Sequence, residues 1–241
     1  KVVPYSWRVS TPLSNFEANL NYKDIQDPSI TVRFKVKGEE SLYFLAWTTT
    51  PWTLPSNQAV CLHGEFDYAL VEIQLEGNSE TILLAKQMVE EVMNRYGCPD
   101  YEILAETKGA LLENIKLQHP FIDKEIPLIL GEHVTTEAGT GAVHTAPDHG
   151  LDDFYVGQNY GLGTLNLVDE NGVFTNGAEE FAGLHIYKVD EPIIEKLKFN
   201  NDWMDKLWGK SGLSDQLLND SKVEMNSIHF HNNSTKYRLY D

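Results

Sequence analysis

Four threonines and an asparagine lie at the end of a strongly apolar stretch, and they are the side chains with which this chain could first do chemistry. The stretch runs from Leu42 to Thr49, and the polar side chains at its end are Thr48, Thr49, Thr50, Thr53 and Asn57. Hydroxyl groups donate and accept hydrogen bonds, so the cluster could orient a water molecule or a polar substrate. Any single threonine here is more simply an ordinary strand residue, because its β-branched shape suits an extended backbone. The run as a whole needs hydrogen-bond partners, because burying unpaired polar atoms is costly.

An internal strand is the element that must carry this cluster. Apolar, aromatic and β-branched residues fill both alternating faces of Leu42–Thr49, which predicts a strand buried on both sides. The strand should stop before Pro51, because proline has no amide proton for the ladder. Thr48 and Thr50 then share one face of the strand and Thr49 takes the other.

A second group of chemically useful residues occupies positions 139–154, which read GTGAVHTAPDHGLDDF. We expect an extended run at Ala142–Thr145, with His144 inside it. We expect a helix at Asp152–Asn159, because aspartates at a helix start bind free amides and are favoured by the helix dipole. A lone histidine in such a run is more often structural than functional.

The rest of the chain predicts short strands with a few helices. Strands are expected at Thr31–Val36, Ala59–Leu62, Tyr68–Leu75, Thr81–Ala85, Tyr101–Glu106 and Leu128–Leu130, and helices at Lys86–Tyr96 and Lys188–Phe199. Residues 1–30 contain several prolines, serines and asparagines, which indicates an irregular linker. Together these elements predict an α+β domain, β-rich and barrel-like, with peripheral helices.

Composition limits the class of protein. The chain has 241 residues, of which 41% are hydrophobic and 11% aromatic, enough for one large folded domain or two small ones. No apolar run approaches the length of a membrane-spanning helix, and the first residues, KVVPYSWRVSTPLS, lack the apolar core of a signal peptide. Cys61 and Cys98 are the only cysteines, so no disulfide framework is expected and a reducing cytoplasm fits best.

The charge balance bears on partners. The formal net charge is −17, which counts against a broad nucleic-acid-binding face because phosphate contacts need lysine and arginine. Any contact with RNA should therefore be local, or directed at something other than the phosphate backbone. The acidity has a simpler explanation in solubility, which needs no partner.

Two separated motifs together resemble a known family. The stretch TTTPWTLPSN (residues 48–57) and the stretch GTGAVHTAPDHGLDDF are similar to the two signatures of the editing domain of isoleucyl-tRNA synthetase, bacterial type, a class I synthetase. The resemblance covers about residues 5–199. Asp148 stands where this family commonly has glycine. The last residues, NSIHFHNNSTKYRLYD, do not match the family pattern.

The resemblance implies a domain organisation and a function. Residues 1–30 would lead in from the synthetase core, residues 31–199 would form the editing domain, and residues 200–241 would be a tail or peripheral segment. The domain would hydrolyse the ester of valine mischarged onto the isoleucine tRNA, through a positioned water, while excluding isoleucine. The sequences HIGH and KMSKS are absent, so we expect no aminoacylation site and no cofactor here; ATP and any zinc would belong to the rest of the parent enzyme. The implied partners are the tRNA 3′ end carrying valine and the rest of the synthetase chain, with no membrane, in a cytoplasmic monomer.

The resemblance also assigns roles to residues. Asp153 would hold the α-ammonium of the substrate through a charge-assisted hydrogen bond; the alternative is that it only caps its helix. His144 would form a pocket wall that clashes with the extra methylene of isoleucine, and Trp52 is placed among the substrate-binding residues. The hydroxyls of Thr48, Thr49, Thr50 and Thr53 would contact the terminal ribose, the carbonyl and the attacking water. Asn57 would orient this network or simply hold the turn.

Two other functions stay open at this stage. A metal-dependent hydrolase could use His144, His149 and either Asp152 or Asp153, although their spacing does not follow the HExxH pattern. A non-catalytic module that binds a tRNA end or another protein is the second alternative, and its binding without turnover would distinguish it from a hydrolase.

Overall fold

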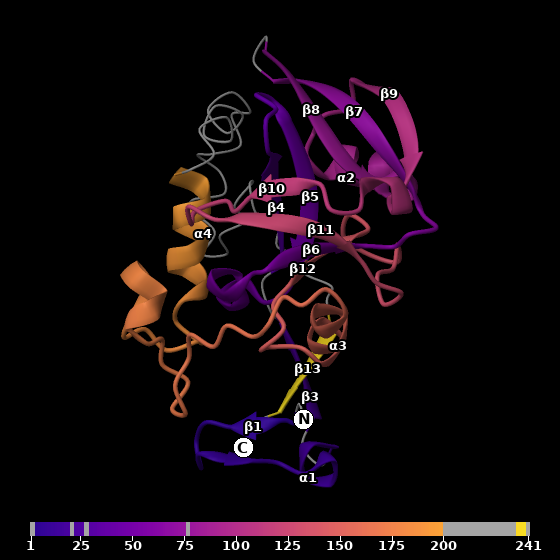
Figure 1. The fold of residues 1–241 in the computed structure, drawn as a ribbon. Helices are drawn as coiled ribbons and strands as arrows, with labels where there is room; N and C mark the ends of the chain where they lie inside the picture. The colour runs from indigo at the N-terminus through magenta and orange to yellow at the C-terminus, as the bar shows by residue number, and fades with distance from the viewer. Residues whose placement is uncertain (1–2, 20–21, 27–28, 76–77, 200–234, 240–241) are drawn as a thin grey trace.

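The computed structural model describes residues 3–19, 22–26, 29–75, 78–199 and 235–239. Its main feature is a nine-stranded sheet with the order β12-β6-β11-β10-β4-β5-β8-β7-β9 (Figure 1). The strands are β4 (Ile30–Val36), β5 (Leu42–Thr48), β6 (Ala59–Leu62), β7 (Asp67–Leu75), β8 (Asn78–Ala85), β9 (Tyr101–Lys108), β10 (Lys116–Gln118), β11 (Glu125–Leu130) and β12 (Ala142–Thr145).

Part of this sheet closes on itself. Strand β12 pairs with β6 at one edge and also with β5, through the parallel partners Val143 and Trp47. The strands from β12 to β5 therefore form a closed barrel, while β8, β7 and β9 continue outward from the first half of β5. The barrel interior contains large, fully buried apolar side chains, among them Phe34, Phe44, Leu62, Leu117, Ile126 and Leu128. Burying each such side chain contributes about 1.5–3 kcal/mol.

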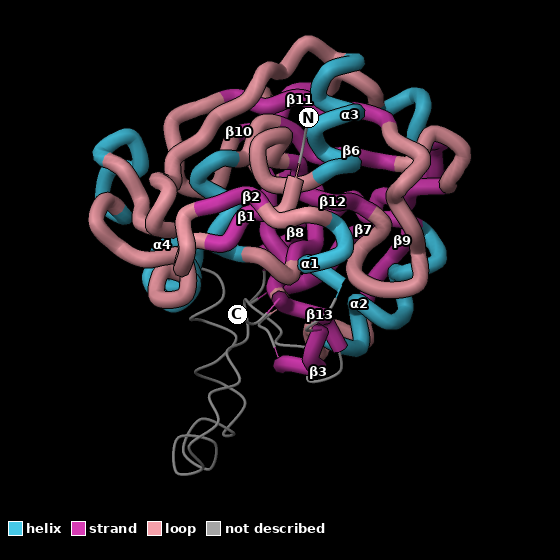
Figure 2. The backbone as a smooth tube through the Cα atoms, turned by 90° about the horizontal axis from the view of Figure 1, so that it is seen from below, coloured by secondary structure: helices cyan, strands magenta, loops and turns pink. Residues whose placement is uncertain are grey.

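Helices surround this sheet. They are α2 (Val89–Arg95), α3 (Leu151–Asn159) and α4 (Asp190–Phe199), with 3-10 turns η1 (Pro51–Ser56), η2 (Lys86–Met88), η3 (Gly109–Leu112) and η4 (Asn176–Phe181). Seen from below, strands occupy the centre and helices and loops lie around them (Figure 2). The expected α+β, β-rich and barrel-like fold with peripheral helices is confirmed.

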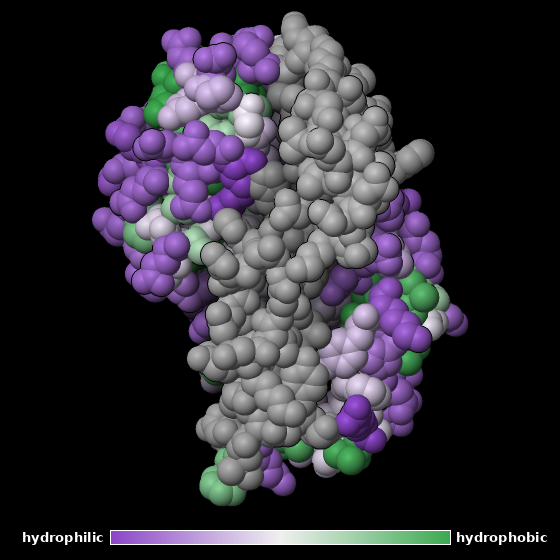
Figure 3. Space-filling view, turned by 180° about the vertical axis from the view of Figure 1, so that it is seen from behind, coloured by the Kyte–Doolittle hydropathy of each residue, from purple (hydrophilic) through white to green (hydrophobic). Residues whose placement is uncertain are grey.

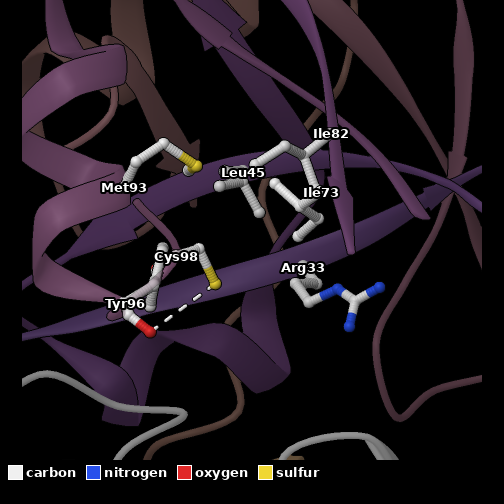
Figure 4. Close-up of a pocket in the computed structure, with 7 residues that line it drawn as sticks. All are labelled: Arg33, Leu45, Ile73, Ile82, Met93, Tyr96 and Cys98. Atoms are coloured by element: carbon white, nitrogen blue, oxygen red, sulfur yellow. Dashed lines mark hydrogen bonds between the residues drawn. The ribbon is translucent and has the colours of Figure 1, made fainter. Parts of the chain in front are cut away.

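Arg33 on β4 forms an ion pair with the outer strand β8. A cavity of about 10 Å³, lined by Arg33, Leu45, Ile73, Ile82, Met93, Tyr96 and Cys98, lies between these strands and α2 (Figure 4). The guanidinium points away from the Cys98 thiol, lies 3.7 Å from the Tyr43 ring centroid and pairs with Glu80 on β8. Both cysteines are free and buried.

The first thirty residues contradict the prediction of an irregular linker. They contain β1 (Tyr5–Ser6), β2 (Thr11–Pro12), α1 (Asn15–Asn19) and β3 (Tyr22–Gln26), and β4 already begins at Ile30. The helix α1 has a capping box, because the Ser14 hydroxyl accepts the Glu17 amide (3.2 Å) while the Glu17 carboxylate accepts the Ser14 amide (2.8 Å). The spacing of Ser14 and Glu17 was a readable signal of that helix.

Other boundaries shift by a few residues. The predicted helix Lys86–Tyr96 divides into η2 and α2, and the strand predicted from Thr81 begins at Asn78. The predicted tail, residues 200–241, lies outside the described residues except for β13 (Thr235–Leu239), which pairs antiparallel with β3. The proposed domain boundaries stay predictions.

One face of the molecule can be judged from the residues that the structure describes there. On the face opposite to that of Figure 1, hydrophilic residues predominate and hydrophobic residues form small separate patches (Figure 3). Within the described ranges, the structure contains no helix with the length and apolar character needed to span a membrane.

The turn before β12 is tightly fitted, and it determines how closely β12 approaches β5. Gly139 and Gly141 have positive φ angles of 84° and 71°. Between them the buried Thr140 hydroxyl donates to the Leu45 carbonyl (2.8 Å), and the Tyr68 hydroxyl donates to the Gly141 carbonyl (2.7 Å). A Cβ at Gly141 would lie 2.2 Å from the Ala85 Cβ. This position therefore needs glycine both for its backbone conformation and for space.

Replacement of Gly141 tests this fit. We expect Gly141→Ala to lower the free energy of unfolding by about 1–2 kcal/mol for the left-handed backbone and by about 1–3 kcal/mol more for the forced shift of neighbours. Gly161→Ala is the matched control, because Gly161 has φ 64° and a Cβ added there would have no neighbouring atom within 4 Å, so only the backbone cost applies. Chemical denaturation measures both; equal losses in the two variants would contradict the close packing at Gly141.

Candidate functional site

The two sequence motifs meet in one cleft. The cleft has a volume of about 240 Å³ and is lined by Trp47, Thr48, Thr49, Thr50, Trp52, Thr53, Val143, His144, His149 and Asp153. The pairing of β5 with β12 explains this, because both strands run in the same direction and end at the same side of the barrel. The residues that follow β5 are thereby placed beside those that follow β12.

The turn η1 arranges the hydroxyl groups. Thr50 comes directly before Pro51, and its amide donates to the Thr48 hydroxyl (3.1 Å). The Thr53 amide donates to the Thr50 carbonyl (3.0 Å), which closes the first turn. The Thr50 hydroxyl oxygen lies 3.3 Å from that of Thr48 and 3.3 Å from that of Thr53. Three hydroxyl groups therefore form one connected row along the cleft.

His144 is held from both sides. Its Nδ1 lies 3.0 Å from the Asn57 side-chain nitrogen, and its Nε2 lies 2.6 Å from the Thr53 hydroxyl oxygen. The Asn57 nitrogen can only donate, so Nδ1 accepts and Nε2–H donates to Thr53. The Thr53 hydroxyl in turn donates to the Thr50 carbonyl (2.8 Å). Burial, together with the nearby rings of His119 and His149, lowers the pKa of His144 to about 3.

This arrangement determines what His144 can do. Because its pKa is so low, the ring is neutral at physiological pH and is a poor proton acceptor. Both ring nitrogens are already engaged, so neither is free for a metal ion. Within the described residues, no three histidine, cysteine, aspartate or glutamate side chains are grouped so that they could hold a metal ion. The ring is best suited to be a fixed wall of the cleft.

Asp153 brings a carboxylate to the same cleft. It is the third residue of α3 and is half-buried, whereas Asp152 is exposed and does not line the cleft. One carboxylate oxygen of Asp153 accepts the Ala146 amide (2.9 Å). A Cβ at Gly150 would lie 3.1 Å from the Asp153 carboxylate, so glycine leaves it room. Burial raises the pKa of Asp153, and the Ala146 hydrogen bond opposes that shift.

The helix-cap explanation of Asp153 is not supported by this geometry. The N-cap of α3 is Gly150, and no side chain makes the capping hydrogen bond. The carboxylate instead ties the start of α3 to Ala146, just after β12. A carboxylate whose burial disfavours its charged form is a suitable partner for a cationic group.

Most of the residues selected from the sequence share this cleft, and one does not line it. The lining includes Thr48, Thr49, Thr50, Thr53, Trp52, His144 and Asp153. Asn57 lies behind the cleft wall, fully buried, where it holds His144 and donates to the Ala59 carbonyl (2.9 Å). Their catalytic and binding roles stay predictions.

Three lining residues had no assigned role in such a cleft. Trp47 and Val143 are ladder partners, and only knowledge of the barrel closure places them together. His149 belongs to the metal-hydrolase alternative; its Nε2 lies 3.2 Å from the Ser56 hydroxyl, and its ring meets the Trp52 ring edge-on with centroids 4.9 Å apart. Burial lowers the pKa of His149. In the sequence, the one indication that His149 lies in the cleft is its position five residues after His144.

The buried histidines should make folding stability depend on pH. Below about pH 6.5 the unfolded chain binds protons that buried His144 and His119, with pKa values of about 3 and about 4, do not bind. The contribution of these histidines to the free energy of unfolding is therefore fully present above about pH 6.5 and is lost progressively as the pH drops toward 4. One histidine changes the free energy of unfolding by at most about 1.4 kcal/mol per pH unit.

We expect His144→Gln to reduce the slope of the unfolding free energy against pH by up to about 1.4 kcal/mol per pH unit, which corresponds to one proton. Denaturation curves measured between pH 4 and 7 give this slope. Above about pH 7 the two proteins should differ by a constant amount, which reports the lost hydrogen bonds alone. Curves that stay parallel throughout the acidic range would contradict the low pKa of His144.

Comparison with known proteins places the chain. A family model described as leucyl-tRNA synthetase, editing domain, matches residues 27–198. An isoleucine–tRNA ligase of Marinomonas sp. is 50% identical over 82% of this chain, and one of Saccharophagus degradans is 45% identical over 82% of it. The chain spans 22% of the length of each of these relatives.

Solved structures support the fold. A crystal structure of the editing domain of the P. knowlesi cytosolic leucyl-tRNA synthetase has a TM-score of 0.58 at 10% identity, covering 78% of this chain and 98% of that one. The structure described as GlLeuRS-CP1 has a TM-score of 0.58 at 14% identity, covering 73% and 96%. The family model, the sequence relatives and the barrel agree: the chain belongs to the editing-domain family of aminoacyl-tRNA synthetases and is of the isoleucyl-tRNA synthetase type.

Proposed function

We propose that this domain hydrolyses the ester bond of valine mischarged onto the isoleucine tRNA and leaves correctly charged isoleucine intact. The observation that carries the proposal is that a row of threonine hydroxyls, a neutral histidine wall and one half-buried carboxylate share a single small cleft. The family supports the reaction class. The partners are the tRNA 3′ end carrying valine and the rest of a synthetase chain, in a cytoplasmic enzyme that works as a monomer.

A second site is needed because a first site cannot discriminate enough. A hydrophobic pocket separates side chains that differ by one methylene by only about 1–3 kcal/mol, a general figure for which isoleucine and valine are the standard example rather than a result from this chain. A cleft that admits valine and excludes isoleucine corrects the resulting errors. His144 suits that task because two hydrogen bonds fix its ring and a displaced ring would lose them.

The chemistry needs no nucleophilic side chain. A water oxygen attacks the ester carbonyl carbon and gives up one proton. The bond to the ribose oxygen breaks and that oxygen takes up a proton, so free valine and the uncharged tRNA end remain. The hydroxyls of Thr48, Thr49 and Thr50 orient the water and donate to the developing oxyanion, which lowers the barrier by positioning and charge stabilisation. The Thr53 proton is held by the Thr50 carbonyl, so Thr53 contributes by keeping this row and His144 in place. Asp153 binds the α-ammonium and so fixes the carbonyl relative to those hydroxyls.

The acidic charge of the chain bears on which part of the synthetase binds the tRNA backbone. With a net charge of −17, the domain offers little attraction for the tRNA backbone. Most backbone contacts therefore come from the rest of the synthetase, and the domain recognises the aminoacyl end. The whole enzyme is accordingly the right material for kinetic tests, with the chain alone as a comparison.

Asp153 is tested against its neighbour. We expect Asp153→Ala to lower kcat/KM for hydrolysis of Val-tRNA by about 10- to 100-fold, because hydrogen bonds to charged groups contribute about 1.5–3 kcal/mol. Asp152→Ala is the matched control, since that carboxylate is exposed and lies outside the cleft. Deacylation assays on the parent synthetase give the result; full activity in Asp153→Ala would refute the ammonium-binding role.

His144 is tested through specificity. We expect His144→Ala to hydrolyse Ile-tRNA, which the unchanged enzyme spares, because the wall that excludes the extra methylene is removed. Val-tRNA hydrolysis in the same variant reports any general damage to the cleft. Continued rejection of isoleucine by a variant that still hydrolyses Val-tRNA would rule out His144 as the size filter.

A further inference from the structure

The turn η1 carries both residues that hold His144, and it is itself held by another part of the chain. Thr53 lies inside the turn and Asn57 directly follows it. The connection between β10 and β11 reaches over to two carbonyl groups of this segment, those of Leu54 and Asn57. The side chains that do so are His119 and Lys124, which we call the brace.

His119 is built into this contact. It is 3% exposed, and its Nε2 lies 3.1 Å from the Leu54 carbonyl oxygen. Its Nδ1 accepts the amides of Phe121 (3.3 Å) and Ile122 (3.0 Å). Because Nδ1 accepts, Nε2 carries the proton and donates to Leu54. The ring also packs edge-on against Phe34 and Phe121, with centroids 6.3 and 4.6 Å away.

Lys124 makes the second contact. Its half-buried ammonium donates to the Asn57 carbonyl at 2.9 Å. Burial lowers the pKa of Lys124. Holding a desolvated ammonium against one backbone carbonyl costs solvation. The hydrogen bond from this ammonium fixes the backbone of Asn57, the residue whose side chain contacts His144.

We propose that His119 and Lys124 are positioning residues for the deacylation reaction: they fix η1, so that Thr53 and Asn57 hold His144 and keep the threonine row aligned with the substrate. This inference rests on the proposed function. Neither brace residue lines the cleft, so each acts through η1 and not on the substrate. Loss of the brace should lower the rate of the chemical step more than it weakens binding, because alignment errors act mainly in the transition state.

Lys124→Met is the primary test, since methionine keeps much of the apolar stem and removes the ammonium. In the parent synthetase we expect kcat for Val-tRNA hydrolysis to fall by about tenfold with KM changed less than about twofold, and Lys124→Arg to recover most of the rate. Lys116→Met is the matched control, because Lys116 lies in β10, is exposed and does not touch η1. A loss shared equally by the Lys116 variant, or a Lys124→Met enzyme with unchanged kcat, would overturn the proposal.

Hydrogen exchange is a readout independent of activity, and it separates the positioning role of the brace from the proposed function. The Asn57 amide donates to the Leu54 carbonyl (2.9 Å) at the end of η1, so its hydrogen exchange in this chain should accelerate several-fold in Lys124→Met. Unchanged exchange at Asn57 overturns the brace whatever the activity. An inactive unchanged synthetase refutes the proposed function, whereas an active one that tolerates Lys124→Met refutes positioning alone.

His119 gives a second, graded test. His119→Gln can keep a donor for the Leu54 carbonyl, while His119→Leu cannot. We expect the glutamine variant to retain clearly more of kcat than the leucine variant at similar unfolding midpoints. Equal kcat values in the two folded variants would show that the hydrogen bond to Leu54 does not position the turn.

Discussion

The parallel contact between Trp47 and Val143 closes the barrel, and the site exists because of it. The outer edge of β5 is shared: its first residues pair with β8 and its last pair with β12. Without the second pairing, the threonines after β5 would lie at an open sheet edge, far from the residues after β12. The close approach depends on the small residues of the preceding turn, since a Cβ at Gly139 would lie 2.8 Å from the Trp47 side chain.

A second constraint follows from burial. Once the barrel closes, His144 is only 4% exposed, and both of its ring nitrogens lie against protein groups. An unpaired buried polar group is costly and a buried charge much more so, so the ring stays neutral and each nitrogen needs a protein partner. Asn57 and Thr53 supply these partners from a segment 87 to 91 residues away in sequence. The donors all run in one direction, from Asn57 through His144 and Thr53 to the Thr50 carbonyl, which leaves a single proton arrangement.

How far the sequence predicts this molecule depends on the range of the interactions concerned. The strand at Leu42–Thr48, the end of it before Pro51 and the helix after Gly150 follow from local pattern, and the structure has them within a residue or two. The capping box at Ser14 and Glu17 is an equally local indication of a helix, but the prolines and asparagines around it favour an irregular segment and so hide it. By contrast, Trp47, Val143 and His149 join the cleft through strand pairing and ring packing between distant segments. No periodicity reports such contacts, and the same holds for the hydrogen bonds of His119 and Lys124 to η1.

The electrostatics of Asp153 connect the fold to the proposed reaction. Burial raises its pKa while the Ala146 amide lowers it, so the charged form is held in place with part of its solvation missing. A cationic group that enters the cleft restores the lost stabilisation, and the gain is larger than it would be at a fully hydrated carboxylate. The adjacent Asp152 is exposed and lies outside the cleft. In the proposed reaction, the choice of Asp153 over Asp152 therefore follows from the direction of α3 after β12, which places one carboxylate in the cleft and the other in water.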